Sequence, residues 1–231
     1  MANSSITRRV LVLGGHGDIG SAIVQRFREA GDQVTSLGRQ DLDLTNPKAI
    51  DSYFATHSKE YDVLVQSAGW NNPKKVESVS REDIETALSV NTLGFLYTAQ
   101  VLIPSFKERK SGSILAISSL YGSFSRVGRL AYSTAKHALN GVVKTLALEL
   151  GPFNIRVNSI SPGFIDTKLT RKNNDSDTIR SLERKIPLGN KLGQPEDIAH
   201  IAYFLCSSQN NFIHGQDIVA DGGYSIGGFQ E

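Results

Sequence analysis

The sequence is poor in the residues that mark several special classes of protein. Its 231 residues include a single cysteine, Cys206, and a single tryptophan. One cysteine excludes an internal disulfide framework and suits a reducing compartment. The 25 basic and 23 acidic residues nearly cancel and are spread along the chain. We therefore predict neither a nucleic-acid surface nor a membrane surface.

Long apolar runs and clusters of metal ligands are also missing. The first apolar run, residues 10–13, is only four residues long, which argues against a signal peptide or a membrane span there. The five histidines show no ligand spacing with one another or with Cys206, so we expect no metal site. We expect a soluble cytoplasmic protein whose residues 1–231 form one domain, because no linker divides the chain.

Short apolar runs alternate with helical patterns along the chain. The runs at 10–13, 33–39, 61–66, 114–117 and 155–160 are typical of buried strands, and a final strand is expected within 215–223. Such alternation predicts parallel strands joined by right-handed crossovers. The expected fold is α/β, a doubly wound parallel sheet of the Rossmann type with helices on both faces and its ligand at the carboxyl edge.

A glycine-rich turn follows the first predicted strand directly. It contains Gly14, Gly17, Ile19 and Gly20, and apolar residues then recur at helical spacing. Glycines in this setting let the backbone approach a pyrophosphate, and the helix N-terminus offers amide hydrogens to it. The turn therefore predicts a dinucleotide site.

Tyr132 and Lys136 are spaced to lie one helical turn apart on the same face. A free tyrosine ionises near pH 10, and a neighbouring cation favours the phenolate, so we predict a lowered pKa for Tyr132. Ser119 ends the strand at 114–117, and Asn91 interrupts a long helical pattern that begins near Arg81. These features make Tyr132 a candidate general acid or base.

Asn91, Ser119, Tyr132 and Lys136 match, in order and spacing, the tetrad of the short-chain dehydrogenase/reductase family, which the sequence resembles over nearly its whole length. The resemblance implies that Ser119 bonds a substrate carbonyl oxygen and that Tyr132 transfers a proton. It assigns Lys136 to the tyrosine pKa and the nicotinamide ribose, and Asn91 to a proton relay. Asp18 stands where the family has a glycine, and we expect it to cap the helix and face away from the pyrophosphate.

The resemblance also implies the contacts of a nicotinamide cofactor. The expected contacts are Gly14, Gly17, Asp18, Ile19, Gly20, Arg39, Asp43, Leu44, Ala68, Gly69, Tyr132, Lys136, Pro162, Gly163, Ile165 and Thr167. Arg39, with no acid until Asp41, favours NADP(H), with NAD(H) as the alternative. Gln66 and Ser67 replace two asparagines of the family pattern, so the contacts made by those amides are open here.

The substrate is left open between three hypotheses. The first is reduction of a 3-oxoacyl thioester on a carrier, whose anionic groups Arg126, Arg129, Arg171 or Lys172 would meet beside the cleft. The second is a sugar or cyclitol dehydrogenase, suggested by glycines spaced three apart. The third is a non-catalytic nucleotide-binding scaffold. We further expect residues 168–185 to form a mobile lid, and the family resemblance implies a homotetramer.

Overall fold

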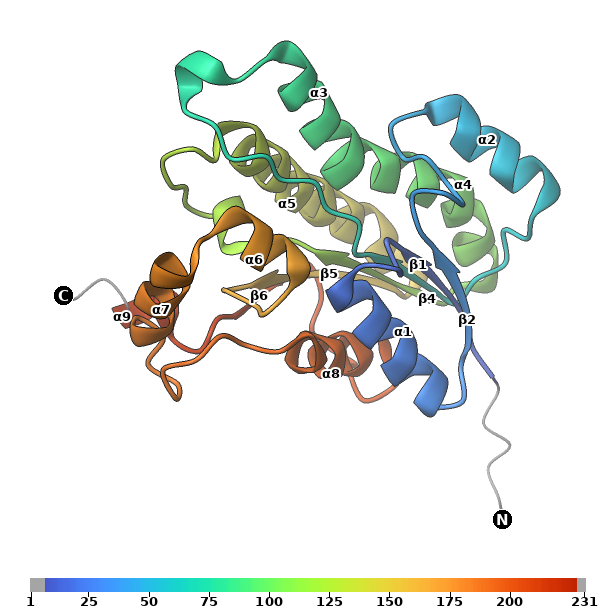
Figure 1. Cartoon of the computed structure of the whole chain (residues 1–231). Coiled ribbons are helices and arrows are strands. Elements are labelled where there is room, and N and C mark those ends of the chain that lie inside the picture. The colour runs from blue at the N-terminus through green and yellow to red at the C-terminus, as the bar shows by residue number, and fades with distance from the viewer. Residues whose placement is uncertain (1–6, 228–231) are drawn as a thin grey trace.

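The structure, a computed structural model, describes residues 7–227. Six strands form one parallel sheet in the order β2-β1-β3-β4-β5-β6 (Figure 1). They are β1 (Arg9–Leu13), β2 (Gln33–Leu37), β3 (Val63–Gln66), β4 (Gly112–Ile117), β5 (Ile155–Pro162) and β6 (Asp217–Ala220). The doubly wound sheet is confirmed. Its order reverses between β1 and β3, and ligands bind at the carboxyl ends of strands at such a point.

Helices cover both faces of the sheet (Figure 1). One face carries α1 (Asp18–Glu29) and α8 (Pro195–Cys206); the other carries α2 (Pro47–Thr56), α4 (Gly94–Arg109) and α5 (Leu130–Leu150), with α3 (Arg81–Leu88) against α5. The remaining elements are short: η1 (Val76–Ser78), η2 (Ser89–Leu93), η3 (Leu120–Gly122), η4 (Gly151–Phe153), α6 (Lys168–Asn173), α7 (Ser176–Arg184) and α9 (Tyr224–Gly227).

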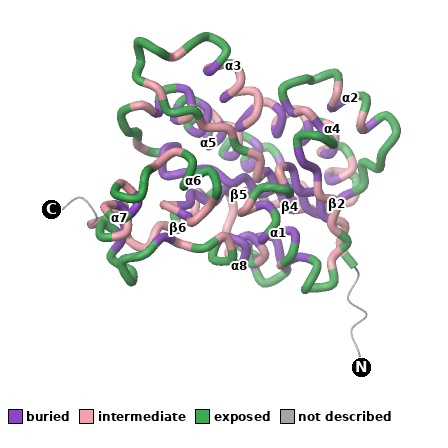
Figure 2. Tube along the Cα trace, viewed as in Figure 1, coloured by how far each residue is buried: buried purple, intermediate pink, exposed green. Residues whose placement is uncertain are grey.

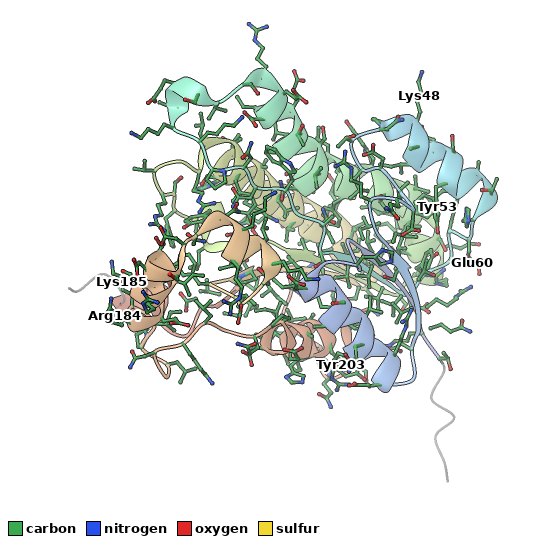
Figure 3. All side chains as sticks on the ribbon, in the orientation of Figure 1. Lys48, Tyr53, Glu60, Arg184, Lys185 and Tyr203 are labelled. Atoms are coloured by element: carbon green, nitrogen blue, oxygen red, sulfur yellow. The ribbon has the colours of Figure 1, made fainter. Side chains whose placement is uncertain are left out.

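Alternate residues of the central strands pack into two separate hydrophobic cores, one on each face of the sheet. Val10 and Val12 pack towards α1 and α8, whereas Leu11 and Leu13 pack towards α2, α4 and α5. All four are buried, as a parallel strand covered on both faces requires. Buried segments gather at the sheet, around β4 and β5 (Figure 2). Tyr203 of α8, labelled in Figure 3, closes the first core from outside, since its ring lies edge-on to Phe27 of α1 at 5.3 Å between centroids.

The sheet ends at β2, which is shorter than the sequence predicts. Gly38 and Arg39 belong to a turn instead, held by the Asp41 carboxylate, which accepts from Gly38 N at 2.7 Å. Helix α2 follows almost at once, begun by Asn46, whose side chain accepts from Lys48 N, and by a proline at the first helical position.

The long helical pattern from Arg81 is a rod broken as expected near Asn91. Helices α3 and α4 are joined by η2, a turn of π-helix, which is a common device for aiming a side chain at a functional site. Residues 81–109 are also, among the described residues, the one helical stretch long and apolar enough to cross a membrane by length and composition. Here Phe95, Leu102 and Phe106 from that stretch fill the core beneath the sheet.

Candidate active site

Two adjoining cavities lie at the carboxyl edge of the sheet. The larger, of about 510 Å³, extends from the glycine turn past Arg39 and Leu44 to Gly69. The smaller, of about 170 Å³, contains Ser119, Tyr132 and Lys136. They share a wall that includes Ile19, Ser67, Ala68, Gly69 and Thr167. Every cofactor contact predicted from the sequence lines one cavity or the other. We call them the nucleotide cavity and the catalytic cavity.

The glycines of the turn are required for different steric reasons. A Cβ on Gly14, whose φ is +74°, would lie 2.3 Å from Ala68 N, and one on Gly20 would lie 2.1 Å from Gly14 O. Both glycines therefore allow backbone segments to touch. A Cβ on Gly17 would meet nothing nearer than 3.4 Å, so this glycine keeps the backbone accessible from the nucleotide cavity.

Asp18 corrects one prediction. It is the first residue of α1 but makes no capping hydrogen bond there. Its carboxylate instead accepts from Lys168 N at 2.6 Å, at the start of α6, and lies 3.9 Å from the Lys168 ammonium. The carboxylate thus ties the glycine turn to a segment 150 residues away, which the sequence around Asp18 does not reveal.

The adenosine side of the nucleotide cavity is formed by the turn after β2. Arg39 is exposed and borders the cavity, and Leu44 is buried in its wall. Asp43 accepts two hydrogen bonds from Thr45, which lower the pKa of its carboxyl group. Asp41 is held by Gly38 N and lies 3.7 Å from His16 Nε2. Arg39 acts on Asp43 through its charge but forms no ion pair within 4 Å among residues 7–227, so it can meet an anion at this end.

Gln66 settles a question raised by the sequence. It is fully buried; its Oε1 accepts from Ala68 N at 3.2 Å and its Nε2 donates to Val90 O at 3.0 Å. The glutamine thereby joins the Ala68-Gly69 turn to η2. Ser67 Oγ, on the wall shared by both cavities, is buried and has no hydrogen-bond partner within the described chain.

The structure brings Ser119, Tyr132 and Lys136 together. Ser119 begins the η3 turn after β4 and accepts from Tyr121 N at 3.2 Å. Tyr132 is in the first turn of α5, and the Lys136 ammonium lies 5.6 Å from the centroid of its ring. That ammonium is buried and donates to Ile117 O at 2.8 Å. Two hydroxyls and a cation therefore meet in the catalytic cavity.

The predicted direction of the Tyr132 pKa is wrong for this structure. Burial of the hydroxyl raises the pKa of Tyr132 to about 12, against the opposing effects of a hydrogen bond with Ser119 and the charge of Arg129. Burial likewise lowers the pKa of Lys136 to about 7. Near neutral pH the phenol holds its proton, so Tyr132 is poised as an acid, while Lys136 is near its titration midpoint.

Asn91 lies behind the site rather than in it. It is fully buried in η2 and lines neither cavity. Its Nδ2 donates to Trp70 O and Ala87 O at 2.9 and 2.8 Å, and its Oδ1 accepts from Trp70 N at 3.3 Å. Asn91 thus fixes the segment after β3 to the interrupted helix.

The loop after β5 closes the site. Pro162, Gly163, Ile165 and Thr167 all border the catalytic cavity. Thr167 also caps α6, since its hydroxyl accepts from Thr170 N at 3.1 Å. The expected lid folds mainly as two helices, α6 and α7, rather than as an irregular loop. Its mobility stays a prediction.

Sequence reasoning missed several residues of the cavity walls. Tyr121 and Asn71 line the catalytic cavity, and Trp70 lines the nucleotide cavity. Each follows a strand end at the carboxyl edge, a signal that could have found them. Within residues 7–227 no three His, Cys, Asp or Glu side chains lie together as metal ligands.

The nucleotide cavity fits a dinucleotide on its own geometry. Accessible backbone at Gly17, the N-terminus of α1 and exposed Arg39 suit phosphate groups. Ser67 Oγ gives an unpaired polar atom at the junction with the catalytic cavity. A ligand that spans the two cavities would bring its far end to Tyr132.

Comparison with known proteins supports the same assignment. Residues 16–225 match a family model described as enoyl-(acyl carrier protein) reductase. The chain is 30% identical to 3-oxoacyl-[acyl-carrier-protein] reductase of Chlamydia pneumoniae over 94% of this chain and 97% of that protein. It is 35% identical to cyclopentanol dehydrogenase of Comamonas sp. over 90% and 83% of the two chains.

Solved structures share the fold over nearly the whole chain. A short-chain dehydrogenase/reductase from Mycobacterium marinum superposes with a TM-score of 0.87 at 28% identity, covering 95% of this chain and 96% of that one. ElxO with bound NADP gives 0.84 at 26% identity over 95% and 99%. The 3-ketoacyl-(acyl-carrier-protein) reductase of Brucella melitensis with NADH gives 0.84 at 27% identity over 95% and 98%. The chain therefore belongs to the short-chain dehydrogenase/reductase family and is an oxidoreductase that interconverts ketones and secondary alcohols.

Proposed function

We propose that the protein reduces a small ketone to a secondary alcohol with NADP(H), and catalyses the reverse reaction, with Ser119, Tyr132 and Lys136 as its catalytic residues. The observation that carries this proposal is the meeting of the Ser119 and Tyr132 hydroxyls in a cavity that adjoins the nucleotide cavity. The bound nicotinamide supplies or accepts the hydride at the carbonyl carbon.

Each catalytic residue has a role that its surroundings support. Ser119 donates a hydrogen bond to the carbonyl oxygen and orients it. Tyr132, whose pKa is raised to about 12, holds its proton at neutral pH and delivers it to that oxygen as the alcohol forms. Lys136 binds the ribose hydroxyls with its ammonium. Because burial lowers its pKa to about 7, the protonated form that places a positive charge beside the phenol is still present at neutral pH. Asn91 acts as a positioning residue in the proton relay.

NADP(H) is the proposed cofactor because Arg39 is exposed at the adenosine end and the nearby Asp41 is engaged by Gly38 N. An arginine pairs with a 2′-phosphate, whereas NAD recognition needs a free acidic side chain. The related structures include one with NADP and one with NADH, so NAD(H) is the alternative.

A 3-oxoacyl thioester is the first substrate to test, since relatives over nearly the full length are named for that reduction. A cyclic secondary alcohol or a keto sugar is the second, supported by the similarity to cyclopentanol dehydrogenase. The hydroxyls of Ser119 and Tyr132, which meet in the catalytic cavity, support carbonyl chemistry over the enoyl reaction that the family model's description names.

The test is the loss of nicotinamide absorbance with purified protein. NADPH and NADH are compared against a short 3-oxoacyl thioester, cyclopentanone and a panel of keto sugars. Turnover that prefers NADPH supports both the reaction and the role of Arg39. A folded protein that binds nucleotide but turns over no carbonyl would instead support the scaffold hypothesis.

We also propose that the chain works as one soluble cytoplasmic catalytic domain within a homotetramer. The catalytic and cofactor residues other than Asn91 line two adjoining cavities at the carboxyl edge of one sheet, which supports a single domain. Helix α5 leaves Leu148 81% exposed, which suits a subunit contact. A monomer mass by light scattering would contradict the tetramer.

A further inference from the structure

A buried arginine, Arg129, lines the catalytic cavity, which is unusual for a site that binds a neutral ketone. It directly precedes α5, three residues before Tyr132, and only 8% of its surface is exposed. Its side chain borders the catalytic cavity, and within the described chain no carboxylate lies within 4 Å of it. An arginine stays charged even when burial lowers its pKa, as it does here.

The partners that Arg129 does have leave the charge poorly compensated. Its Cζ lies 5.7 Å from the centroid of the Tyr121 ring, a cation–π contact. The buried Tyr121 hydroxyl lies beside the guanidinium and acts to raise the pKa of Arg129, but a neutral hydroxyl does not balance the charge. A desolvated charge is normally paired with an opposite charge, because burying it alone is costly. No described residue supplies that opposite charge, so a ligand in the cavity is the candidate for it.

The rest of the cavity wall agrees with an anionic guest. Its charged side chains are Arg129 and Lys136, and the residues that line it in the described chain include no Asp or Glu. Lys136 is already engaged by Ile117 O. Among the residues that the structure describes, no backbone oxygen accepts a hydrogen bond from the Arg129 side chain, in contrast to Lys136.

The other cations near the cleft do not share this setting. Arg171 is bound by Asp166 through two hydrogen bonds of 2.7 and 2.6 Å, and Lys172 is exposed on α6. Arg184 and Lys185 lie at the outer end of α7, away from the sheet (Figure 3). Buried charge within the catalytic cavity thus distinguishes Arg129.

We propose that the carbonyl substrate carries a carboxylate, which pairs with Arg129 while its ketone meets Ser119 and Tyr132. This inference rests on the proposed function and narrows its substrate to short oxo acids. The rings of Tyr132 and Tyr121 are 6.3 Å apart, and Arg129 lies over the second ring. Arg129, Ser119 and Tyr132 line the same cavity of about 170 Å³, where a carboxylate a few bonds from the ketone can meet the arginine. A carrier phosphate lies many bonds from the reacting carbonyl, so it fits this position less well.

The test compares acetoacetate with its methyl ester, which has the same ketone but no charge. The wild-type protein should prefer the acid in kcat/KM by about tenfold or more, the effect of one charged hydrogen-bond pair. Arg129→Gln should bring the acid-to-ester ratio close to one, and Arg129→Lys should restore part of it. Lys172→Gln removes the same charge from an exposed site and should leave the ratio unchanged.

Equal turnover of acid and ester by the wild type would overturn this inference and leave the proposed function standing. So would an equal fall on both substrates in Arg129→Gln. An Arg129-dependent gain only with a coenzyme A thioester, relative to its N-acetylcysteamine analogue, would assign the arginine to a carrier phosphate and also overturn it.

If the protein turns over no carbonyl, calorimetry distinguishes the carboxylate site at Arg129 from the proposed reaction. The measurement is the binding of acetoacetate in the absence of nucleotide. Binding by the wild type that Arg129→Gln weakens about tenfold would then support the carboxylate site while the proposed reaction fails. Equal or absent binding in both proteins would overturn the site as well.

Discussion

The buried ammonium of Lys136 makes the stability of the protein depend on pH in a specific window. The side chain is 2% exposed, and burial lowers its pKa from 10.5 to about 7. Below pH 7 both the folded and unfolded chains hold the proton, and the cost of burying the charge is fully present. Between pH 7 and 10.5 the unfolded chain binds more protons than the folded one. Stability contributed by this group therefore rises with pH across that window.

The size of the effect follows from the two pKa values. One pH unit corresponds to about 1.4 kcal/mol, so a fall from 10.5 to about 7 sets a ceiling on the order of 5 kcal/mol. The perturbation is Lys136→Met, which keeps the length and removes the charge. The free energy of unfolding of this variant should exceed that of the wild type most at pH 6–7, and the difference should shrink towards pH 10. Loss of the hydrogen bond to Ile117 O lowers the stability of the variant at every pH.

Urea unfolding at pH 6, 7, 8, 9 and 10, monitored by circular dichroism, measures both proteins. Lys144→Met, at an exposed position of the same helix, is the matched control and should run parallel to the wild type. If the difference between the wild type and Lys136→Met stays constant from pH 6 to 10, Lys136 does not carry a strongly lowered pKa, and the account of its titration is wrong.

Three further changes test other parts of the site. Asn91→Ala removes three hydrogen bonds to backbone groups and should cost about 2–4 kcal/mol in urea unfolding; a loss below 0.5 kcal/mol, on the order of a surface change, would refute its positioning role. Gly20→Ala should destabilise by more than about 2 kcal/mol because its Cβ would lie 2.1 Å from a backbone oxygen, whereas Gly17→Ala should change stability by less than about 1 kcal/mol yet weaken NADPH binding about tenfold or more. Equal nucleotide affinity in Gly17→Ala and the wild type would show that the turn does not approach the phosphates. Arg39→Gln should reduce the kcat/KM preference for NADPH over NADH by about tenfold or more, and an unchanged preference would make Arg39 an ordinary surface residue.

The sequence predicts those features that depend on local pattern. Strand β1, the glycine turn and α1 follow from an apolar run, three glycines and helical spacing. The proximity of Tyr132 and Lys136 follows from their spacing of four. Helix α2 also has a local sequence signal, a capping Asn46 followed by Pro47.

Other features depend on contacts that distant segments create. Asp18 has its partner at Lys168, and no local rule connects the two. The pKa of Tyr132 is raised because the folded chain surrounds its hydroxyl, and this burial outweighs the cation expected from the sequence. Arg129 resembles Arg126 and Arg171 as a sequence feature, and only the fold distinguishes the buried arginine from the exposed ones.

The most direct test of the central claim is Tyr132→Phe, assayed for turnover and for nucleotide binding together. Trp70, the single tryptophan of the sequence, borders the nucleotide cavity, so its fluorescence reports NADPH binding without turnover. We predict that kcat falls at least about 100-fold, the contribution of a general acid, while the dissociation constant for NADPH stays within a few-fold of wild type. Turnover within a few-fold of wild type, with the same binding, would contradict the assignment of Tyr132 as the proton donor.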